Sequence, residues 1–75
     1  MTSQKVHAIW SRELDLPEFS DDDDFFQLGG HSLIMTRIQK AVADELGVEI
    51  SMDKLLREST VSRIAAHIDS LLAVS

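Results

Sequence analysis

Apolar residues recur at helical spacing in three stretches of this 75-residue chain, whereas no stretch alternates apolar and polar residues over the length of a strand. Such spacing puts the apolar side chains of each stretch on one face of a helix, which must be buried against a neighbour. The three sets are Val6, Ile9, Trp10 and Leu14; Ile34, Ile38, Ala41 and Val42; and Val61, Ile64, Ala65, Ile68, Leu71 and Leu72.

Local signals divide the second half of the chain further. Gly47 is a plausible C-terminal stop for the second helix, and Thr60 can cap the last one. Residues 52–57 form a short helical candidate, while Val48–Ile50 is too short to pair as a strand alone. We therefore predict an all-α fold, a small four-helix bundle of three main helices and one short helix.

The segment from Asp15 to His31 loses the helical period. It contains Pro17, four consecutive aspartates at 21–24 and the pair Gly29-Gly30, so we predict a long loop between the first and second helices. Loops of this length in compact domains are uncommon and are often functional. The expected anchors of the loop are its large apolar residues, of which at least two should reach the core: Phe19, Phe25, Phe26 and Leu28.

Size and charge exclude several classes of function. A chain of this length makes a single domain spanning residues 1–75, with little room to enclose a catalytic pocket. The net charge of −6 argues against nucleic acid as a partner. The sequence has no apolar run of membrane-spanning length, no signal peptide and no cysteine, and its three histidines lack metal-ligand spacing. We therefore expect a non-enzymatic, cytoplasmic monomer without a metal site or membrane contact.

The loop ends in a motif, Asp23 to Leu33, that places Ser32 at the start of the second helix. A serine nucleophile of the α/β-hydrolase type needs Gly-x-Ser-x-Gly after a strand. Ile34 stands where the second glycine should be, and no strand precedes Ser32. His31, as a sequence neighbour, has poor reach to act as a base. A hydrolase is therefore disfavoured.

A calcium loop starting at Asp21 is disfavoured too. An EF-hand needs alternating oxygen ligands, a central glycine and a terminal glutamate. Phe25 replaces the third ligand, Phe26 the glycine and Ser32 the glutamate. The four aspartates are better interpreted as a solvated acidic loop in which one side chain caps a local turn.

Two interpretations of Ser32 remain open from its residue type and position alone. A serine at a helix start commonly caps the helix with its hydroxyl. Alternatively, the hydroxyl carries a covalently attached group, because a phosphodiester there would meet free backbone N–H groups and the positive end of the helix dipole. The cap explains the serine but not the glycines that precede it, and glycine allows close approach of a partner enzyme.

The motif resembles the core motif of peptidyl carrier (thiolation) domains of nonribosomal peptide synthetases, approximately Asp-x-Phe-Phe-x-Leu-Gly-Gly-His/Asp-Ser-Leu/Ile. The chain matches this pattern throughout residues 23–33, with Gln27 at a position where glutamate is common. The resemblance extends to the Trp10-containing first helix, the Leu46–Val48 turn and the Ser59–Val61 start of the last helix.

The resemblance implies a 4′-phosphopantetheine arm on Ser32, flanked by Gly30, His31 and Leu33. A phosphopantetheinyl transferase would install the arm from coenzyme A. The thiol of the arm would carry an aminoacyl or peptidyl group as a thioester. The other implied partners are an adenylation domain or ligase, and condensation, thioesterase or tailoring enzymes.

The class of carrier is a separate question. Acyl carrier proteins share this fold but usually show Asp-Ser-Leu and a strongly acidic second helix, whereas this chain has His31, Arg37 and Lys40. These residues favour the peptidyl class, with an acyl or aryl cargo as the alternative. We expect Leu33, Met35 and Arg37 to contact partner enzymes, because apolar residues beside the serine suit transient docking and a cation at the rim sets register.

Overall fold

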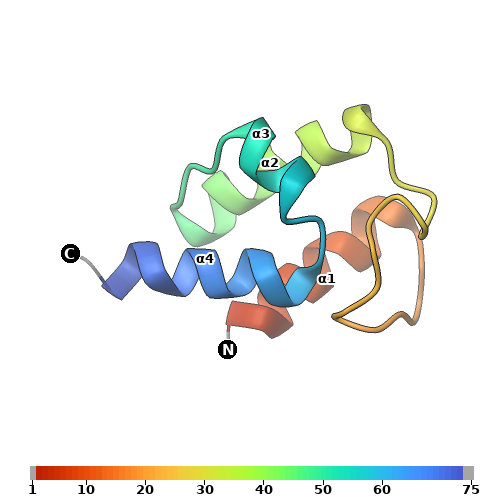
Figure 1. Ribbon diagram of the computed structural model, residues 1–75, viewed down its shortest axis with the longest axis horizontal. Helices are drawn as coiled ribbons and strands as arrows, with labels where there is room; N and C mark the ends of the chain where they lie inside the picture. Colours follow the sequence, from red (N-terminus) through yellow and green to blue (C-terminus); the bar gives the residue numbers. More distant parts are fainter. Residues whose placement is uncertain (1, 74–75) are drawn as a thin grey trace.

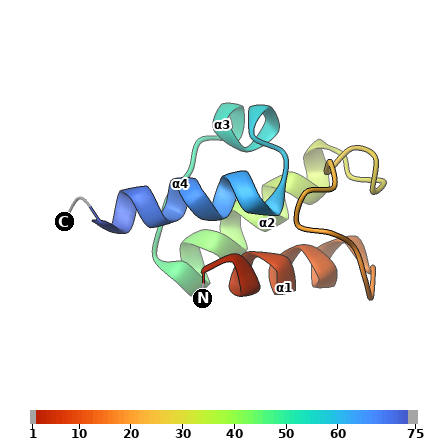
Figure 2. The same ribbon diagram turned by 60° about the horizontal axis from the view of Figure 1, so that its bottom comes forward.

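The computed structural model describes residues 2–73, which form four helices joined by irregular segments. These are α1 (Thr2–Leu14), α2 (Ser32–Leu46), α3 (Met52–Arg57) and α4 (Val61–Ala73). The long helices α1, α2 and α4 run side by side, with α1 opposite in direction to the other two (Figures 1 and 2). The short helix α3 lies over α2 and leads into α4. The predicted four-helix fold and the loop at 15–31 are thus confirmed.

The helix ends follow local chemistry. α2 stops where Gly47 adopts a left-handed conformation (φ 68°), and the Gly47 N–H donates to the carbonyl of Ala43. The Ser51 hydroxyl accepts from the Lys54 N–H and caps α3. Thr60 accepts from the Arg63 N–H in the same way before α4, as predicted. The signals at Gly47 and Thr60 are short-range, which explains why the sequence alone identified them, whereas the Ser51 cap was not predicted.

The core is one cluster to which every helix and the long loop contribute. Trp10 of α1 is fully buried in it and packs edge-on against Phe25 of the loop, with ring centroids 5.3 Å apart. Its other buried apolar members are Val6, Ile9, Met35, Ile38, Val42, Val48, Ile50, Leu55, Val61, Ile64, Ala65 and Ile68. The segment 48–50, considered above as a possible strand, is irregular and buries Val48 and Ile50.

Several side chains differ in burial from what the sequence predicted. Met35 is fully buried, so its predicted role as a partner contact is wrong. The buried face of α2 consists of Met35, Ile38 and Val42, while Ile34 is only partly buried. Phe26 was expected among the loop anchors, yet it is 49% exposed. Phe25 enters the core instead, and Phe19 and Leu28 pack against it.

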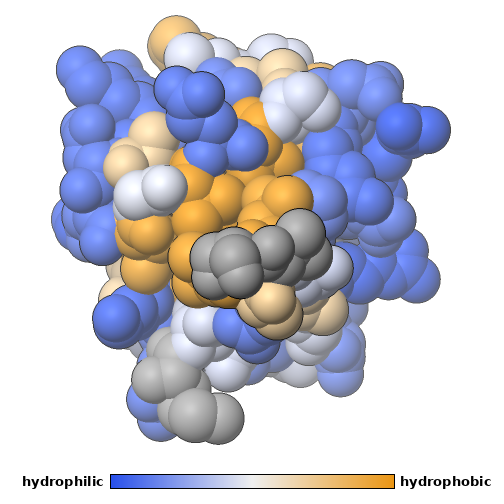
Figure 3. Space-filling view, turned by 90° about the vertical axis from the view of Figure 1, so that its left-hand side faces the viewer, coloured by the Kyte–Doolittle hydropathy of each residue, from blue (hydrophilic) through white to orange (hydrophobic). Residues whose placement is uncertain are grey.

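The ends of the bundle differ in character. Ser32 begins α2 at the end where the long loop lies, and α4 finishes at the opposite end (Figures 1 and 2). Viewed from the end where α4 finishes, the molecule shows an apolar area framed by hydrophilic residues (Figure 3). Leu71 and Leu72, predicted on the buried face of the last helix, are instead exposed on the last turn of α4, so that part of the prediction is wrong. Within residues 2–73, no helix has the length and apolar character needed to cross a membrane.

Candidate functional site

The loop closes into a tight turn immediately before α2. One carboxylate oxygen of Asp24, Oδ2, accepts from the N–H groups of Phe26 (2.9 Å) and Gln27 (3.3 Å). The carbonyl of Phe25 accepts from the N–H groups of Leu28 (3.2 Å) and Gly30 (3.0 Å). These bonds close the turn, whose last residue lies two positions before Ser32.

The two glycines of the turn serve different purposes. Gly29 adopts a φ of +92°, a region that residues with a side chain rarely occupy, but the space around it is open. Gly30 lies against the ring of the buried Phe25, where a Cβ atom would come within 2.4 Å of the ring carbons Cε2 and Cζ. Gly29 is therefore needed for backbone conformation and Gly30 for close packing.

Ser32 is the first helical residue of α2 and is solvent-exposed. The N-cap is His31, which has extended backbone angles (φ −150°, ψ 174°) and makes no side-chain capping bond. The first bond of the helix runs from the Met35 N–H to the His31 carbonyl. The cap interpretation of Ser32 is thus wrong, because the serine lies inside the helix, one residue past the cap position.

This arrangement leaves hydrogen-bonding capacity at the start of α2. The N–H groups of residues 32–34 lie in the first turn of α2 and have no carbonyl to bond within the helix. In the described part of the chain, neither these groups nor the Ser32 hydroxyl has a hydrogen-bond partner. An anion esterified to the hydroxyl would therefore meet free donors and the positive end of the helix dipole.

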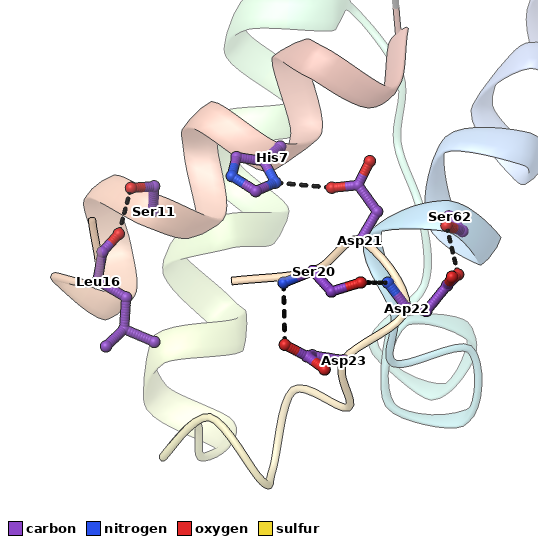
Figure 4. Close-up of polar contacts among 8 residues, drawn as sticks. All are labelled: His7, Ser11, Leu16, Ser20, Asp21, Asp22, Asp23 and Ser62. Atoms are coloured by element: carbon purple, nitrogen blue, oxygen red, sulfur yellow. Dashed lines mark hydrogen bonds and ion pairs between the residues drawn. The ribbon is translucent and has the colours of Figure 1, made fainter. Parts of the chain in front are cut away.

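The acidic run is more than a solvated loop. Asp21 lies 2.6 Å from the His7 ring of α1, and Asp22 accepts from the Ser62 hydroxyl of α4 at 2.9 Å (Figure 4). Asp23 accepts from the N–H of Ser20, within the loop. Asp24, as predicted for one of the four, caps a turn. The sequence did not indicate that these carboxylates tie the loop to two helices, because the contacts are long-range.

Asp24 also bonds beyond the turn. Its second oxygen, Oδ1, accepts from the Ser59 hydroxyl at 2.7 Å. That hydrogen bond is the main reason why the pKa of Asp24 lies below its ordinary value; the N–H groups of Gln27 and Phe26 add to the lowering, and desolvation opposes it. Within residues 2–73, no group of three or more histidine or acidic side chains is arranged to hold a metal ion.

Exposed apolar side chains flank the serine. Leu33 is 59% exposed directly after it, and Phe26 is exposed in the turn before it. Arg37 is exposed one helical turn beyond Leu33. A pocket of about 500 Å³ lies further along α2, between Gln39, Lys40 and the segment 49–51. Ser32 does not line this pocket, and its side chain is exposed on the surface.

Comparison with known proteins now decides the family. The family described as "Phosphopantetheine attachment site" matches residues 4–68. The chain belongs to this phosphopantetheine-binding carrier family. It is a carrier domain, and the group that the family attaches covalently is 4′-phosphopantetheine. The free donors and unpartnered hydroxyl at the start of α2 fit a phosphate ester at this position.

The relatives of this carrier domain include large synthetases. It is 41% identical over 69 residues to surfactin synthase subunit 1 of Bacillus subtilis (strain 168), covering 92% of the chain but 2% of that protein. It is 39% identical over 61 residues to a dimodular nonribosomal peptide synthase of the same organism, covering 81% of the chain and 3% of the relative. The carrier domain thus corresponds to a small part of these relatives.

Solved structures agree on the fold. BlmI, a type-II acyl-carrier protein from Streptomyces verticillus involved in bleomycin biosynthesis, matches with a TM-score of 0.89 at 28% identity, over 95% of this chain and 86% of BlmI. A structure of the phosphopantetheine transferase Sfp with coenzyme A and a peptidyl carrier protein matches with a TM-score of 0.90 at 28% identity, over 93% of this chain and 91% of that chain. The resemblance to peptidyl carrier domains is confirmed.

Proposed function

We propose that Ser32 is the attachment residue of this carrier domain and that the domain carries an aminoacyl or peptidyl group between enzymes of nonribosomal peptide synthesis. The observation that carries the proposal is the exposed Ser32 hydroxyl at the first position of α2, next to backbone donors; among residues 2–73 neither the hydroxyl nor these donors have a hydrogen-bond partner. When attached there, the arm supplies a terminal thiol on which the cargo is held as a thioester.

The residues around Ser32 have distinct proposed roles. Gly30 keeps the turn packed on Phe25, which leaves the approach to the hydroxyl free of side chain at that position. His31 is exposed and contributes its carbonyl to the first bond of α2, so its ring remains available to the phosphate or to a partner. Leu33, exposed on the other side, offers an apolar contact. None of these groups is proposed to catalyse a reaction.

The proposed partners follow from the relatives. A phosphopantetheinyl transferase would modify Ser32, in keeping with the complex that the transferase Sfp forms with coenzyme A and another peptidyl carrier protein. An adenylation domain or ligase would load the arm, and condensation, thioesterase or tailoring enzymes would use the cargo, in keeping with the peptide synthases among the relatives. We also propose that the domain works as a monomer in the cytoplasm, without nucleic acid or membrane.

Docking is proposed to use Leu33 and Arg37, with Phe26 in place of Met35. Leu33 and Phe26 are two of the large apolar side chains that are well exposed among the described residues. Exposed apolar groups near a reactive position suit a transient interface, and burying them removes apolar area from water. Arg37 pairs with no carboxylate in the described part of the chain, which leaves it available for a charge contact at the rim.

Mass spectrometry tests the attachment. The whole chain is incubated with coenzyme A and a broad-specificity phosphopantetheinyl transferase, and its intact mass should show one phosphopantetheine addition. The same treatment of Ser32→Ala should show none, while Ser51→Ala, which alters another serine at a helix start, should be modified like the parent. An addition that persists in Ser32→Ala would refute the attachment residue.

Cargo class is tested with two loaded forms. BlmI, named as an acyl-carrier protein, shares this fold, so acyl cargo is the second candidate. The branched side chains of Ile38, Ile64 and Ile68 fill the core, which leaves an acyl chain no ready space inside. Aminoacylation should therefore shift amide signals only near Ser32. Strong shifts at the three isoleucines with an octanoyl form, together with loading by a fatty-acid pathway enzyme and not by an adenylation domain, would favour the acyl class.

A further inference from the structure

The segment just before α4 is hydrogen-bonded to the turn before Ser32, and the sequence did not predict these contacts. Ser59 lies between α3 and α4, is 8% exposed and is the buried polar residue of the described chain. Its hydroxyl donates to Asp24 Oδ1 at 2.7 Å, and its carbonyl accepts from the Phe25 N–H at 2.8 Å. These two bonds, which we call the clamp, hold Asp24 and Phe25 to Ser59, 34 positions after Phe25 in the sequence.

The clamp holds the first two residues of the turn. Asp24 links Ser59 to the turn, because its Oδ1 accepts from the Ser59 hydroxyl while its Oδ2 accepts from the N–H groups of Phe26 and Gln27. A carboxylate that accepts three hydrogen bonds is strongly oriented, because charge-assisted bonds are stronger than neutral ones. The lowered pKa of Asp24 agrees with this geometry.

A short series of contacts leads from the clamp to the serine. Phe25, held by Ser59, is fully buried and accepts from the Gly30 N–H at 3.0 Å. Gly30 lies so close to the Phe25 ring that a Cβ atom would not fit between them. His31 follows as the cap of α2 and Ser32 as its first residue. The location of Phe25 therefore limits where the Ser32 hydroxyl can lie.

We infer that Asp24 is a positioning residue for the modification of Ser32: through Ser59 it holds the turn 24–30 against the start of α4 and thereby presents the hydroxyl to the transferase. The inference rests on the attachment function proposed above. Asp24 makes no hydrogen bond to Ser32 among the described residues, so in this proposal it acts through Phe25 and Gly30. Small displacements of a reacting group lower rates steeply, because the reacting atoms must meet in one geometry.

The neighbouring aspartates provide a matched control. Asp23 is also a carboxylate of the same run, but it accepts from the Ser20 N–H and makes no hydrogen bond to Ser59 or α4 among the described residues. Asp23→Ala removes the same charge as Asp24→Ala without opening the clamp. Asp24→Asn removes the charge as well, but its amide oxygen can accept from the turn and its amide nitrogen can donate to the Ser59 oxygen.

The experiment measures transfer by a broad-specificity phosphopantetheinyl transferase with coenzyme A, at a temperature where far-UV circular dichroism shows each variant folded. Asp24→Ala should lower kcat/KM on the order of tenfold. Asp24→Asn should restore most of the rate, and Asp23→Ala should match the parent. Amide spectra of Asp24→Ala should shift over residues 25–33 and at Ser59, while signals of α1 remain in place.

Each outcome bears on one of the two proposals. If Asp24→Ala melts at a lower temperature but transfers at the parental rate when folded, Asp24 is structural only and the inference fails. Failure of Asp24→Asn to restore the rate would overturn it as well. If Asp24→Ala does not fold, Ser59→Ala decides, because it removes the hydroxyl that bonds Asp24 but keeps the carbonyl bonded to Phe25; a parental rate there refutes the positioning role of Asp24 through Ser59. Absence of modification in the parent chain would instead refute the attachment function itself.

Discussion

The α-carbon of Gly30 packs against the ring of Phe25, and a Cβ atom at residue 30 would lie 2.4 Å from two carbon atoms of that ring. Phe25 is fully buried among Trp10 and the rest of the core, so its ring cannot move away from a Cβ atom at residue 30 without displacing other core side chains. One tight contact thus joins the hydrophobic core to the residue that stands two positions before the proposed attachment serine.

This contact predicts that Gly30→Ala and Phe25→Leu are energetically coupled. Gly30→Ala should be destabilising on its own, and less so when Phe25→Leu has removed the ring, with a coupling of about 1 kcal/mol or more. Gly29→Ala is the control, because its cost arises from backbone conformation at φ +92° with no atom nearby. Chemical denaturation of the single and double variants gives the coupling of Phe25→Leu with Gly30→Ala and its coupling with Gly29→Ala. Equal couplings for the two glycines would contradict the packing role of Gly30.

A second prediction separates stability from modification at two serines. Ser32→Ala should change the free energy of unfolding by no more than about 0.5 kcal/mol, because the exposed hydroxyl has no partner among the described residues. Ser51→Ala should cost about 1 kcal/mol, since it removes the acceptor that caps α3. Urea unfolding measures both. A loss at Ser32 equal to that at Ser51 would mean that the Ser32 hydroxyl supports the helix.

The third prediction concerns two neighbouring apolar residues of α2. Met35→Ala should cost about 2–5 kcal/mol, because its fully buried side chain would leave a cavity. Leu33→Ala should leave the melting temperature nearly unchanged, because its side chain is 59% exposed, but should raise the KM for a transferase or adenylation domain. Thermal melts and steady-state kinetics test the pair. A normal KM for Leu33→Ala with every enzyme tested would exclude Leu33 from docking.

Acid should weaken the attachment of the loop to α4. The pKa of Asp24 is lowered in the folded chain, chiefly by the Ser59 hydrogen bond, so the carboxylate stabilises the fold fully above the ordinary aspartate pKa of about 3.9. This contribution is lost as the pH falls through the lower pKa of the folded state. The difference in melting temperature between the parent and Asp24→Asn should therefore shrink from about pH 6 to about pH 2. A difference in melting temperature that is constant over this range would show that ionisation of Asp24 does not contribute to the stability of the fold.

Much of this protein was determined by local sequence. The helix periodicity, the stop at Gly47, the short helix at 52–57 and the cap at Thr60 all appear as predicted, because each depends on residues within a turn or two of one another. The motif around Ser32 likewise pointed to the family through its residue order. The exposed position of the serine followed from two glycines and a helix start, which are also local features.

Tertiary structure decided which side of each element is covered. Helical spacing places Met35 and Ile34 on adjacent parts of α2, but only the packing of neighbouring elements determines that Met35 is fully buried and Ile34 partly exposed. In the same way, adjacent phenylalanines cannot show which ring enters the core and which faces solvent. The partners of the acidic run were equally hidden, because Asp22 and Asp24 meet Ser62 and Ser59 only after the chain has folded back on itself. Sequence patterns report neighbours along the chain, whereas burial and long-range hydrogen bonds depend on neighbours in space.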